Sequence, residues 1–335
     1  MWARCRRLLP AVPPAAAALS FVASGVGSGS GGGGPKGRLR GLASNCEQGN
    51  DDALSISVGC YNVLCSTYAV KWGEREGVGG NGATNWSLRW PVMCNIINRA
   101  RWDVVCLQEV ERTDVDEITS GLGDGYTTFY FKHQKRPPDG LMIAVRTKAF
   151  HMKTTPMELQ HNGVAFGGVD LVHRASGRKV RVVTAHCRGR NAAQLEALAD
   201  FAEDCREEPD VTVVTGDFNE DFSTSDRTGV RCPFPEGRAG TYTTLLREPE
   251  LPMLSRPPHK QGEDQKSGKG KIDWIFVRGN GRSQSVIELF RDPASRLAIL
   301  SSHAPCAATG HWPSDHGAEA LSIRLLSSPK AKPQL

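Results

Sequence analysis

Short apolar runs rich in β-branched residues alternate with helical stretches from residue 54 onward, a pattern typical of a layered α/β domain. Ten strands exceed what one sheet comfortably holds, so we expect two packed mixed β-sheets flanked by helices. The predicted strands are Leu54–Val63, Val104–Gln108, Tyr126–Phe131, Leu141–Arg146, Gly163–His173, Lys179–His186, Val211–Gly216, Ile272–Val277, Ser285–Phe290 and Glu319–Leu325.

Two helices carry clear signals. Between residues 191 and 206, Asn191 can cap the first turn and Gln194 follows three positions later. This helix has one apolar stripe, made of Leu195, Leu198, Ala199, Ala202 and Cys205. A second helix is predicted over Ser87–Arg99, with an inward face made of Trp90, Met93, Cys94 and Ile97. The charged, glycine-rich segment 257–271 predicts a loop.

The first 45 residues have a different composition: arginines, an Ala-rich run over Pro10–Val26, then a Gly/Ser tract through Gly34. We predict a leader and flexible linker over 1–45, one folded domain over 46–328 and a tail over 329–335. Arginines without acids favour a mitochondrial transit peptide, and plastid import is an alternative. The Ala-rich run also fits a secretory segment, and a plain disordered tail would leave the protein cytoplasmic.

The formal charge of +5 is unevenly distributed. Six Lys or Arg residues and no acids lie in residues 1–45, which leaves 35 of the 41 basic residues against 36 acidic ones, a net −1. The folded part is therefore not a cationic body that grips long nucleic acid through many phosphates. The sequence contains no apolar span of 18 residues, so it predicts no membrane helix.

Ten cysteines and nine histidines show no spacing of a disulfide framework or zinc site. There is no CxxC pair and no HxxxH pair. Four of the cysteines lie in or beside apolar strand-like runs: Cys60, Cys65, Cys106 and Cys187. We predict reduced core thiols of an intracellular protein.

Polar side chains stand where the apolar strands stop. Asp217 and Asn219 follow Val211–Gly216, and two residues apart on a strand their side chains would point the same way. Taken singly, each such residue is explained as a turn, a cap or a structural histidine. If the strand ends converge, they build one polar pocket. The remaining members are Asn62, Glu109, His186, Asp273, Asp315 and His316.

In order, these residues stand in YNVL, LQEVE, TAHC, GDFN, IDWIFV and PSDH, and the set resembles the endonuclease/exonuclease/phosphatase superfamily through about residues 54–326. The resemblance implies a four-layer α/β sandwich. Within that superfamily, the sequence most resembles the branch that contains the CCR4-type deadenylases and nocturnin. The segments that carry this resemblance are YNVLC, the WSLRW helix entry, VVCLQEVE and Pro138-Asp139-Gly140.

One segment discriminates within that branch. Deadenylases typically carry an aromatic and acidic sequence after the strand-end histidine, whereas here Arg188-Gly189-Arg190 gives the basic, small, basic pattern of nocturnin. By the same resemblance, we expect Lys132 to correspond to another phosphate-facing lysine of nocturnin. The alternative is that both arginines are solvated or contact an RNA backbone. Thr184 and Cys187 depart from the family, which usually has Asn and Leu there.

The resemblance implies a metal-dependent hydrolase of phosphate esters. We expect Mg²⁺, or Mn²⁺, on Glu109 with Asn62 and Asp315. The expected catalytic residues are His186, Asp217, Asn219, Asp273 and His316; the expected substrate-binding residues are Asn62, Lys132, Arg188 and Arg190. The leading substrate is the 2′-phosphate of NADP(H). A 3′ exoribonuclease releasing AMP from the RNA 3′ end of poly(A) is the alternative, and an inactive adaptor on the same fold is the second.

Overall fold

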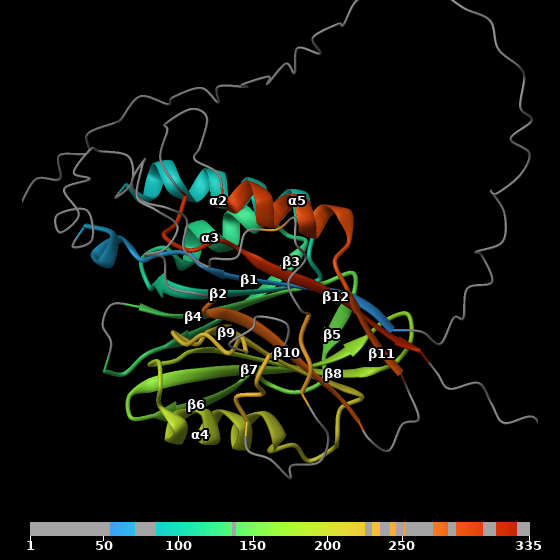
Figure 1. Cartoon of the computed structure of the whole chain (residues 1–335). Coiled ribbons are helices and arrows are strands. Elements are labelled where there is room, and N and C mark those ends of the chain that lie inside the picture. The colour runs from blue at the N-terminus through green and yellow to red at the C-terminus, as the bar shows by residue number, and fades with distance from the viewer. Residues whose placement is uncertain are drawn as a thin grey trace, which may run out of the picture. The chain divides into compact units, whose positions relative to one another are not determined.

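Two six-stranded sheets pack face to face in the described part of the chain (Figure 1). The computed structural model describes residues 54–70, 85–135, 139–224, 230–234, 242–245, 251, 271–280, 286–303 and 313–326. All of these belong to one compact unit that starts at Asn50.

The first sheet has the order β11-β12-β1-β2-β4-β3. Its strands are β1 (Leu54–Asn62), β2 (Val104–Glu111), β3 (Tyr126–Lys132), β4 (Asp139–Arg146), β11 (Val286–Phe290) and β12 (Glu319–Leu326). β1 runs parallel to β2, and the other pairs are antiparallel. The carboxyl ends of β1 and β2 therefore lie at the same edge.

The second sheet has the order β10-β9-β8-β7-β5, and β6 pairs with β7 beside it. Its strands are β5 (Phe150–Met152), β6 (Met157–His161), β7 (Val164–His173), β8 (Lys179–His186), β9 (Val211–Asp217) and β10 (Asp273–Gly279). β8 and β9 are parallel, and β10 is antiparallel to β9. The start of β10 therefore meets the ends of β8 and β9.

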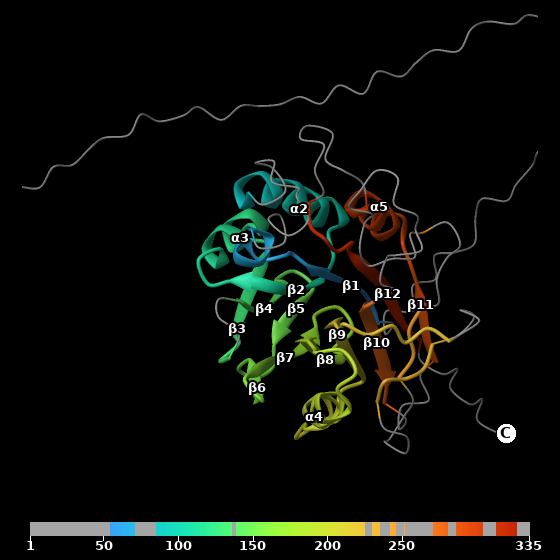
Figure 2. The same cartoon turned by 60° about the vertical axis from the view of Figure 1, so that its left-hand side comes forward.

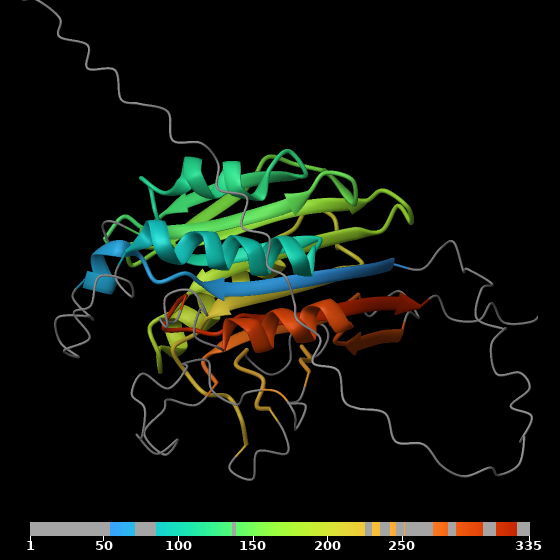
Figure 3. The ribbon, with the colours of Figure 1, turned by 90° about the horizontal axis from the view of Figure 1, so that it is seen from above.

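Helices cover the outer face of each sheet, which gives four layers (Figures 1 and 2). α2 (Trp86–Ala100), α3 (Val115–Leu122) and α5 (Pro293–Ser302) lie on the first sheet, where α2 and α5 run side by side (Figure 3). α4 (Ala192–Glu203) lies on the second. Strand alternation sends one set of side chains between the sheets and the other under the helices.

The predicted layered fold is confirmed, and all ten predicted strands are present with ends shifted by a few residues at most. The sequence interpretation missed two short strands, β5 and β6, and two helices, α3 and α5. No helix among the described residues is long and apolar enough to span a membrane.

Both predicted helices form. α4 is capped by Asn191, whose side chain accepts from the Gln194 N–H, and its inward face contains Leu198, Ala199 and Ala202. Cys205 lies beyond the helix end and is only half-buried. α2 begins one residue earlier than predicted, after the Asn85 cap, and buries Trp90, Met93 and Ile97 while Cys94 is half-buried.

Cys60, Cys65, Cys106 and Cys187 are buried free thiols, as predicted. The predicted leader and linker over 1–45, the domain limits at 46 and 328, and the tail over 329–335 lie outside the described residues. So does the predicted loop, except for Lys271.

Candidate active site

The strand ends converge. We call the residues that meet there the strand-end cluster: Asn62, Glu109, His186, Asp217, Asn219, Asp273, Asp315 and His316. They come from both sheets and from the turn before β12. The two parallel pairs place four carboxyl ends at one edge, and β10 pairs Asp273 directly with Asp217. Topology therefore gathers residues that are far apart in sequence.

Asn62 joins the two sheets. Its Nδ2 donates to Glu109 Oε1 and to Asp217 Oδ2, each at 3.0 Å, and its Oδ1 accepts from the Leu64 N–H at 2.9 Å. The backbone contact fixes the amide orientation, because only the carbonyl oxygen can accept from an N–H. Both acids are thereby held toward one point between the sheets.

Glu109 sits in a β-bulge and not at the end of its strand. β2 continues to Glu111, and its register with β4 shifts between Gln108 and Val110. Glu109 adopts φ +59°, a conformation that non-glycine residues rarely hold without a compensating role. The bulge turns its carboxylate toward the segment that follows β1, where Oε2 accepts from the Cys65 N–H at 3.2 Å.

We expected strand alternation to point the side chains of Asp217 and Asn219 the same way, and this expectation was wrong. β9 ends at Asp217, and Asn219 follows with φ +52°. The Asn219 N–H donates to Asp217 Oδ1 at 2.8 Å, which makes an Asx turn. The turn brings both side chains to the cluster, because Asn219 Nδ2 reaches His186 Nε2 at 3.1 Å.

His316 is held by Asp273, whose Oδ2 lies 2.8 Å from its Nδ1. Its Nε2 faces Asp217 Oδ2 at 3.7 Å and Asp315 Oδ1 at 3.8 Å. Burial works to lower the pKa of His316, but the carboxylates of Asp273, Asp315 and Asp217 outweigh it and raise this pKa to about 10. The ring is therefore an imidazolium at neutral pH, with Nε2–H directed into the cluster.

The two acids bridged by Asn62 hold protons more readily than ordinary carboxyls. Burial, followed by repulsion from Asp315, raises the pKa of Glu109 to about 7. Burial also raises the pKa of Asp217 to about 6, although the charge of His316 opposes it. Clustered carboxylates with raised pKa values are typical of metal and catalytic sites.

Arg89 ties the turn that carries Asp315 to the end of β1. Its guanidinium donates to the carbonyls of Val63, Leu64 and Pro313 at 2.7–3.1 Å while only 2% of its surface is exposed. The Ser314 hydroxyl adds a 2.7 Å bond to the Asn62 carbonyl. These contacts hold the Asp315-His316 pair beside Asn62.

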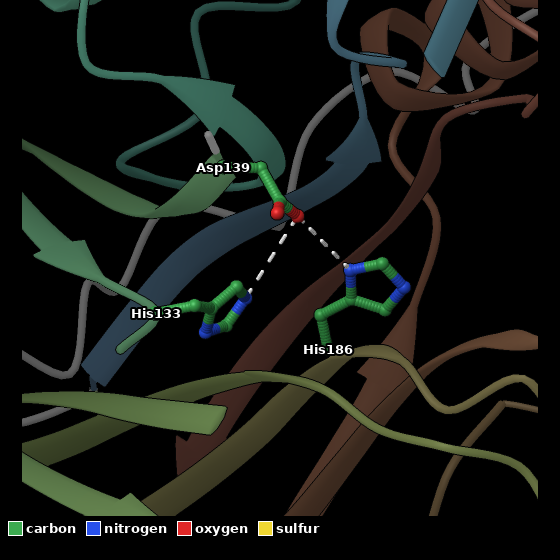
Figure 4. A group of neighbouring side chains, drawn as sticks. All are labelled: His133, Asp139 and His186. Carbon is green, nitrogen blue, oxygen red and sulfur yellow. Dashed lines mark ion pairs between the residues drawn. The ribbon is translucent and has the colours of Figure 1, made fainter. Parts of the chain in front are cut away.

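Two residues behind His186 were not assigned a role from the sequence. His133 and Asp139 are fully buried, and Asp139 Oδ2 lies 3.9 Å from His186 Nδ1 (Figure 4). Asp139 belongs to the Pro138-Asp139-Gly140 sequence that carried the resemblance, which was the available signal. Nothing in the sequence pointed to His133.

The predicted substrate-binding cations differ in position. Arg188 and Arg190 are exposed immediately after His186, and a Cβ at Gly189 would overlap the carbonyl oxygen of Asn219, so their loop lies against the cluster. Lys132 is exposed while Phe131 and His133 on either side are buried, so strand alternation turns it away from them. Its predicted role in binding a substrate phosphate stays a prediction.

Comparison with known proteins decides the family. The sequence matches the Endonuclease/Exonuclease/phosphatase family over residues 61–316, which spans every member of the strand-end cluster. The chain belongs to this family. No curated protein sequence matches it.

Several solved structures share the fold at low identity. ANGEL2, a 2′,3′-cyclic phosphatase in complex with adenosine-2′,3′-vanadate, is 17% identical with TM-score 0.56, over 82% of this chain and 96% of that one. The human nocturnin catalytic domain with bound sulfate is 16% identical with TM-score 0.51, over 83% and 97%. A mannosyl-6-phosphatase from Bacteroides thetaiotaomicron is 16% identical with TM-score 0.52, over 81% and 99%.

Family membership identifies the chain as a metal-dependent phosphoester hydrolase, as the sequence predicted. At 15–17% identity the structural likeness supports the family fold but not the nocturnin branch within it. The two departures from the family pattern lie outside the cluster. Thr184 accepts from Gln108 Nε2 at 3.1 Å, and Cys187 packs in the core beneath α4.

The donor set fits a hard divalent cation. Ligand atoms of Glu109, His186 and Asp217 lie within 4.8 Å of one another. His186 Nε2 faces the Asn219 amide, so the ligand atoms that Glu109 and Asp217 offer are carboxylate oxygens, which can hold a cation while they still accept hydrogen bonds. Mg²⁺ and Mn²⁺ prefer such oxygen ligands, and Mg²⁺ keeps several waters beside them.

Proposed function

We propose that the chain is a Mg²⁺-dependent phosphatase, similar to nocturnin, that removes the 2′-phosphate from NADP(H). The observation that carries this proposal is the loop with Arg188 and Arg190, which lies against the cluster directly after His186. Two guanidinium groups there suit a compact ligand with several phosphates. The near-neutral remainder of the chain favours such a ligand over a long polyanion.

The catalytic work would be divided among the cluster residues. Bound to Glu109, with Asn62 and Asp315 beside it, Mg²⁺ would neutralise charge on a phosphate oxygen. Asp217 would orient the attacking water and take its proton, since its carboxylate has a pKa of about 6. His316, held by Asp273, would donate Nε2–H to an equatorial phosphate oxygen.

The bond between phosphorus and the ribose 2′-oxygen breaks as the water oxygen bonds to phosphorus, and the leaving oxygen takes up a proton. His186 would relay it: its Nε2 lies 3.5 Å from Asp217 Oδ2, so the proton that Asp217 takes from the water would pass to this nitrogen and from it to the leaving oxygen. Once Nε2 holds that proton, the Asn219 amide hydrogen that faces it would turn to an oxygen of the pentacovalent state.

A 3′ exoribonuclease that releases AMP from poly(A) is the second candidate. It uses the same reaction centre, and the exposed side chains of Arg188 and Arg190 would contact the RNA backbone instead. An inactive adaptor is the third, and the complete set of acids, amides and imidazoles counts against it.

Purified protein given NADPH and oligo(A) in parallel, with Mg²⁺, separates the candidates. Phosphate release without RNA shortening supports the proposal, and AMP release supports the exoribonuclease. Arg188→Ala with Arg190→Ala should raise KM for NADPH at least tenfold. Arg99→Ala, an exposed arginine in the last turn of α2, is the matched control and should change nothing.

We also propose mitochondrial import through residues 1–45, which contain six cations and no acid. Fusing this segment to a fluorescent protein tests it. Mitochondrial fluorescence supports import, whereas cytoplasmic, plastid or secretory signal contradicts it.

A further inference from the structure

A buried trio lies directly behind the strand-end cluster. His133 follows β3, Asp139 begins β4 and His186 ends β8. Asp139 Oδ2 is 4.0 Å from His133 Nε2 and 3.9 Å from His186 Nδ1, and Figure 4 shows both rings turned toward it. The other carboxylate oxygen accepts from the Tyr68 hydroxyl at 3.3 Å. The trio thus connects the first sheet to a histidine of the second.

One end of the trio fixes the tautomer of His133. The backbone N–H of Ala165 donates to His133 Nδ1 at 2.9 Å. A nitrogen that accepts a hydrogen bond carries a lone pair, so neutral His133 has its proton on Nε2. That N–H faces Asp139.

The other end fixes the tautomer of His186. Asn219 Nδ2 lies 3.1 Å from the Cys187 carbonyl oxygen, which can only accept, so Nδ2 is the NH₂ end of the amide. Its other hydrogen points to His186 Nε2 at 3.1 Å. Nε2 is therefore the acceptor, and neutral His186 carries its proton on Nδ1, toward Asp139.

These tautomers distinguish two uses of the trio. The three groups approach within 4.8 Å and are of metal-ligating types. A cation between them would need lone pairs on both nitrogens that face Asp139, yet both carry protons. A carboxylate receiving N–H from two rings needs no cation, so the trio is an orienting network.

We propose that Asp139, held by His133, is a positioning residue that fixes the ring and tautomer of His186. Its consequence for catalysis rests on the proposed function. With Nδ1–H directed at Asp139, Nε2 is the nitrogen presented to Asp217 and Asn219. Both distances to Asp139 exceed a hydrogen bond, as catalytic contacts often do before substrate binds.

The local backbone is built for this arrangement. A Cβ at Gly140 would overlap the carbonyl oxygen of Phe131, so only glycine lets β4 approach β3 this closely. That approach pairs Lys132 with Gly140 and puts His133 and Asp139 side by side at the end of the hairpin.

The test is the ¹⁵N spectrum of labelled histidines, which reports each tautomer without substrate. We expect His186 as the Nδ1–H form in the wild type, and a shift to the Nε2–H form in Asp139→Ala. Asp139→Asn guards against misfolding; its amide oxygen is a weaker acceptor than a carboxylate, so a smaller shift than in Asp139→Ala is expected. The exposed His151 is the control: His151→Gln identifies its resonance, which should be the same in the wild type and in the Asp139 variants.

Turnover gives the second readout. Asp139→Asn should lower kcat for phosphate release about 10- to 100-fold with KM within about twofold. His133→Ala should lower kcat, and His133→Gln, whose amide can still donate to Asp139, should restore part of it. An unchanged His186 tautomer in both folded Asp139 variants overturns the proposal, as does unchanged kcat. If the wild type does not hydrolyse NADPH but Asp139→Ala still shifts the His186 tautomer, the positioning role is supported and the proposed substrate is overturned.

Discussion

Asn62 is the residue through which the two sheets share one site. Its amide donates to Glu109 and Asp217 at 3.0 Å each, although the two acids belong to different sheets. Without it, two buried carboxylates lose their common partner and are free to turn apart. The geometry of the site therefore depends on one neutral side chain as much as on its charges.

Replacing Asn62 by alanine tests that dependence. We expect kcat/KM for phosphate release to fall about 10²- to 10³-fold, because a positioned donor in a water-excluded site contributes that much. Asn95→Ala, an exposed asparagine on α2, is the matched control. Activity of Asn62→Ala within a few-fold of wild type would show that the bridge is dispensable.

Metal affinity should depend on pH. Protons and the cation compete for Glu109, whose pKa burial raises to about 7. Metal affinity should therefore level off above pH 8 and fall about tenfold per pH unit below pH 7. Calorimetric titration of Mn²⁺ at pH 8.0, 7.0 and 6.0 measures this affinity. Equal affinity at all three pH values would contradict the assignment of Glu109 as a ligand.

Most of the site could be predicted at the residue scale because its members follow apolar runs. Asp217 and His186 each end a buried strand, where a polar side chain is conspicuous. His133 was not found, since it stands after an exposed lysine and its partners come from other strands. The bulge at Glu109 was also missed, because sequence alternation does not reveal a local register shift.

At the scale of elements, Gly59 shows how the layers are fitted together. A Cβ on Gly59 would overlap the indole ring of Trp102, which is fully buried and donates from Nε1 to Ser295 Oγ of α5. The middle of β1 must therefore be glycine for Trp102 to fill the space between sheet and helix.

Gly59→Ala should destabilise the fold by about 3 kcal/mol or more, since a buried ring would have to move. Gly125→Ala is the matched control, because a Cβ there meets nothing within 4 Å. Urea unfolding followed by tryptophan fluorescence gives both values. Equal midpoints for the two variants would contradict the packing described for Trp102.

The missed elements share weak sequence signals. β5 has three residues and β6 has five, and apart from Phe150 all of them are exposed or half-buried. α3 buries only Ile118 and Leu122, too few to mark a stripe. α5 carried a signal that the prediction did not use, because Asp292 caps it and Pro293 opens it.

At the scale of the molecule, topology turns a common α/β pattern into a site. Parallel pairs in both sheets bring the ends of β1, β2, β8 and β9 to one edge, and antiparallel β10 adds Asp273 from its start. The sequence could predict the strands and the four layers. Their order was not predicted, because hydrophobic patterning does not specify which strands pair.

The central claim is that the strand-end cluster is a metal-dependent phosphatase centre. Phosphate release from NADPH, measured with Mg²⁺ and with a chelator, tests it most directly. We expect wild-type turnover to require the metal. Asp217→Ala and His316→Ala should lose about two to four powers of ten in kcat while circular dichroism melting shows an intact fold. Substantial turnover in either variant, or in wild type under excess chelator, would contradict the account.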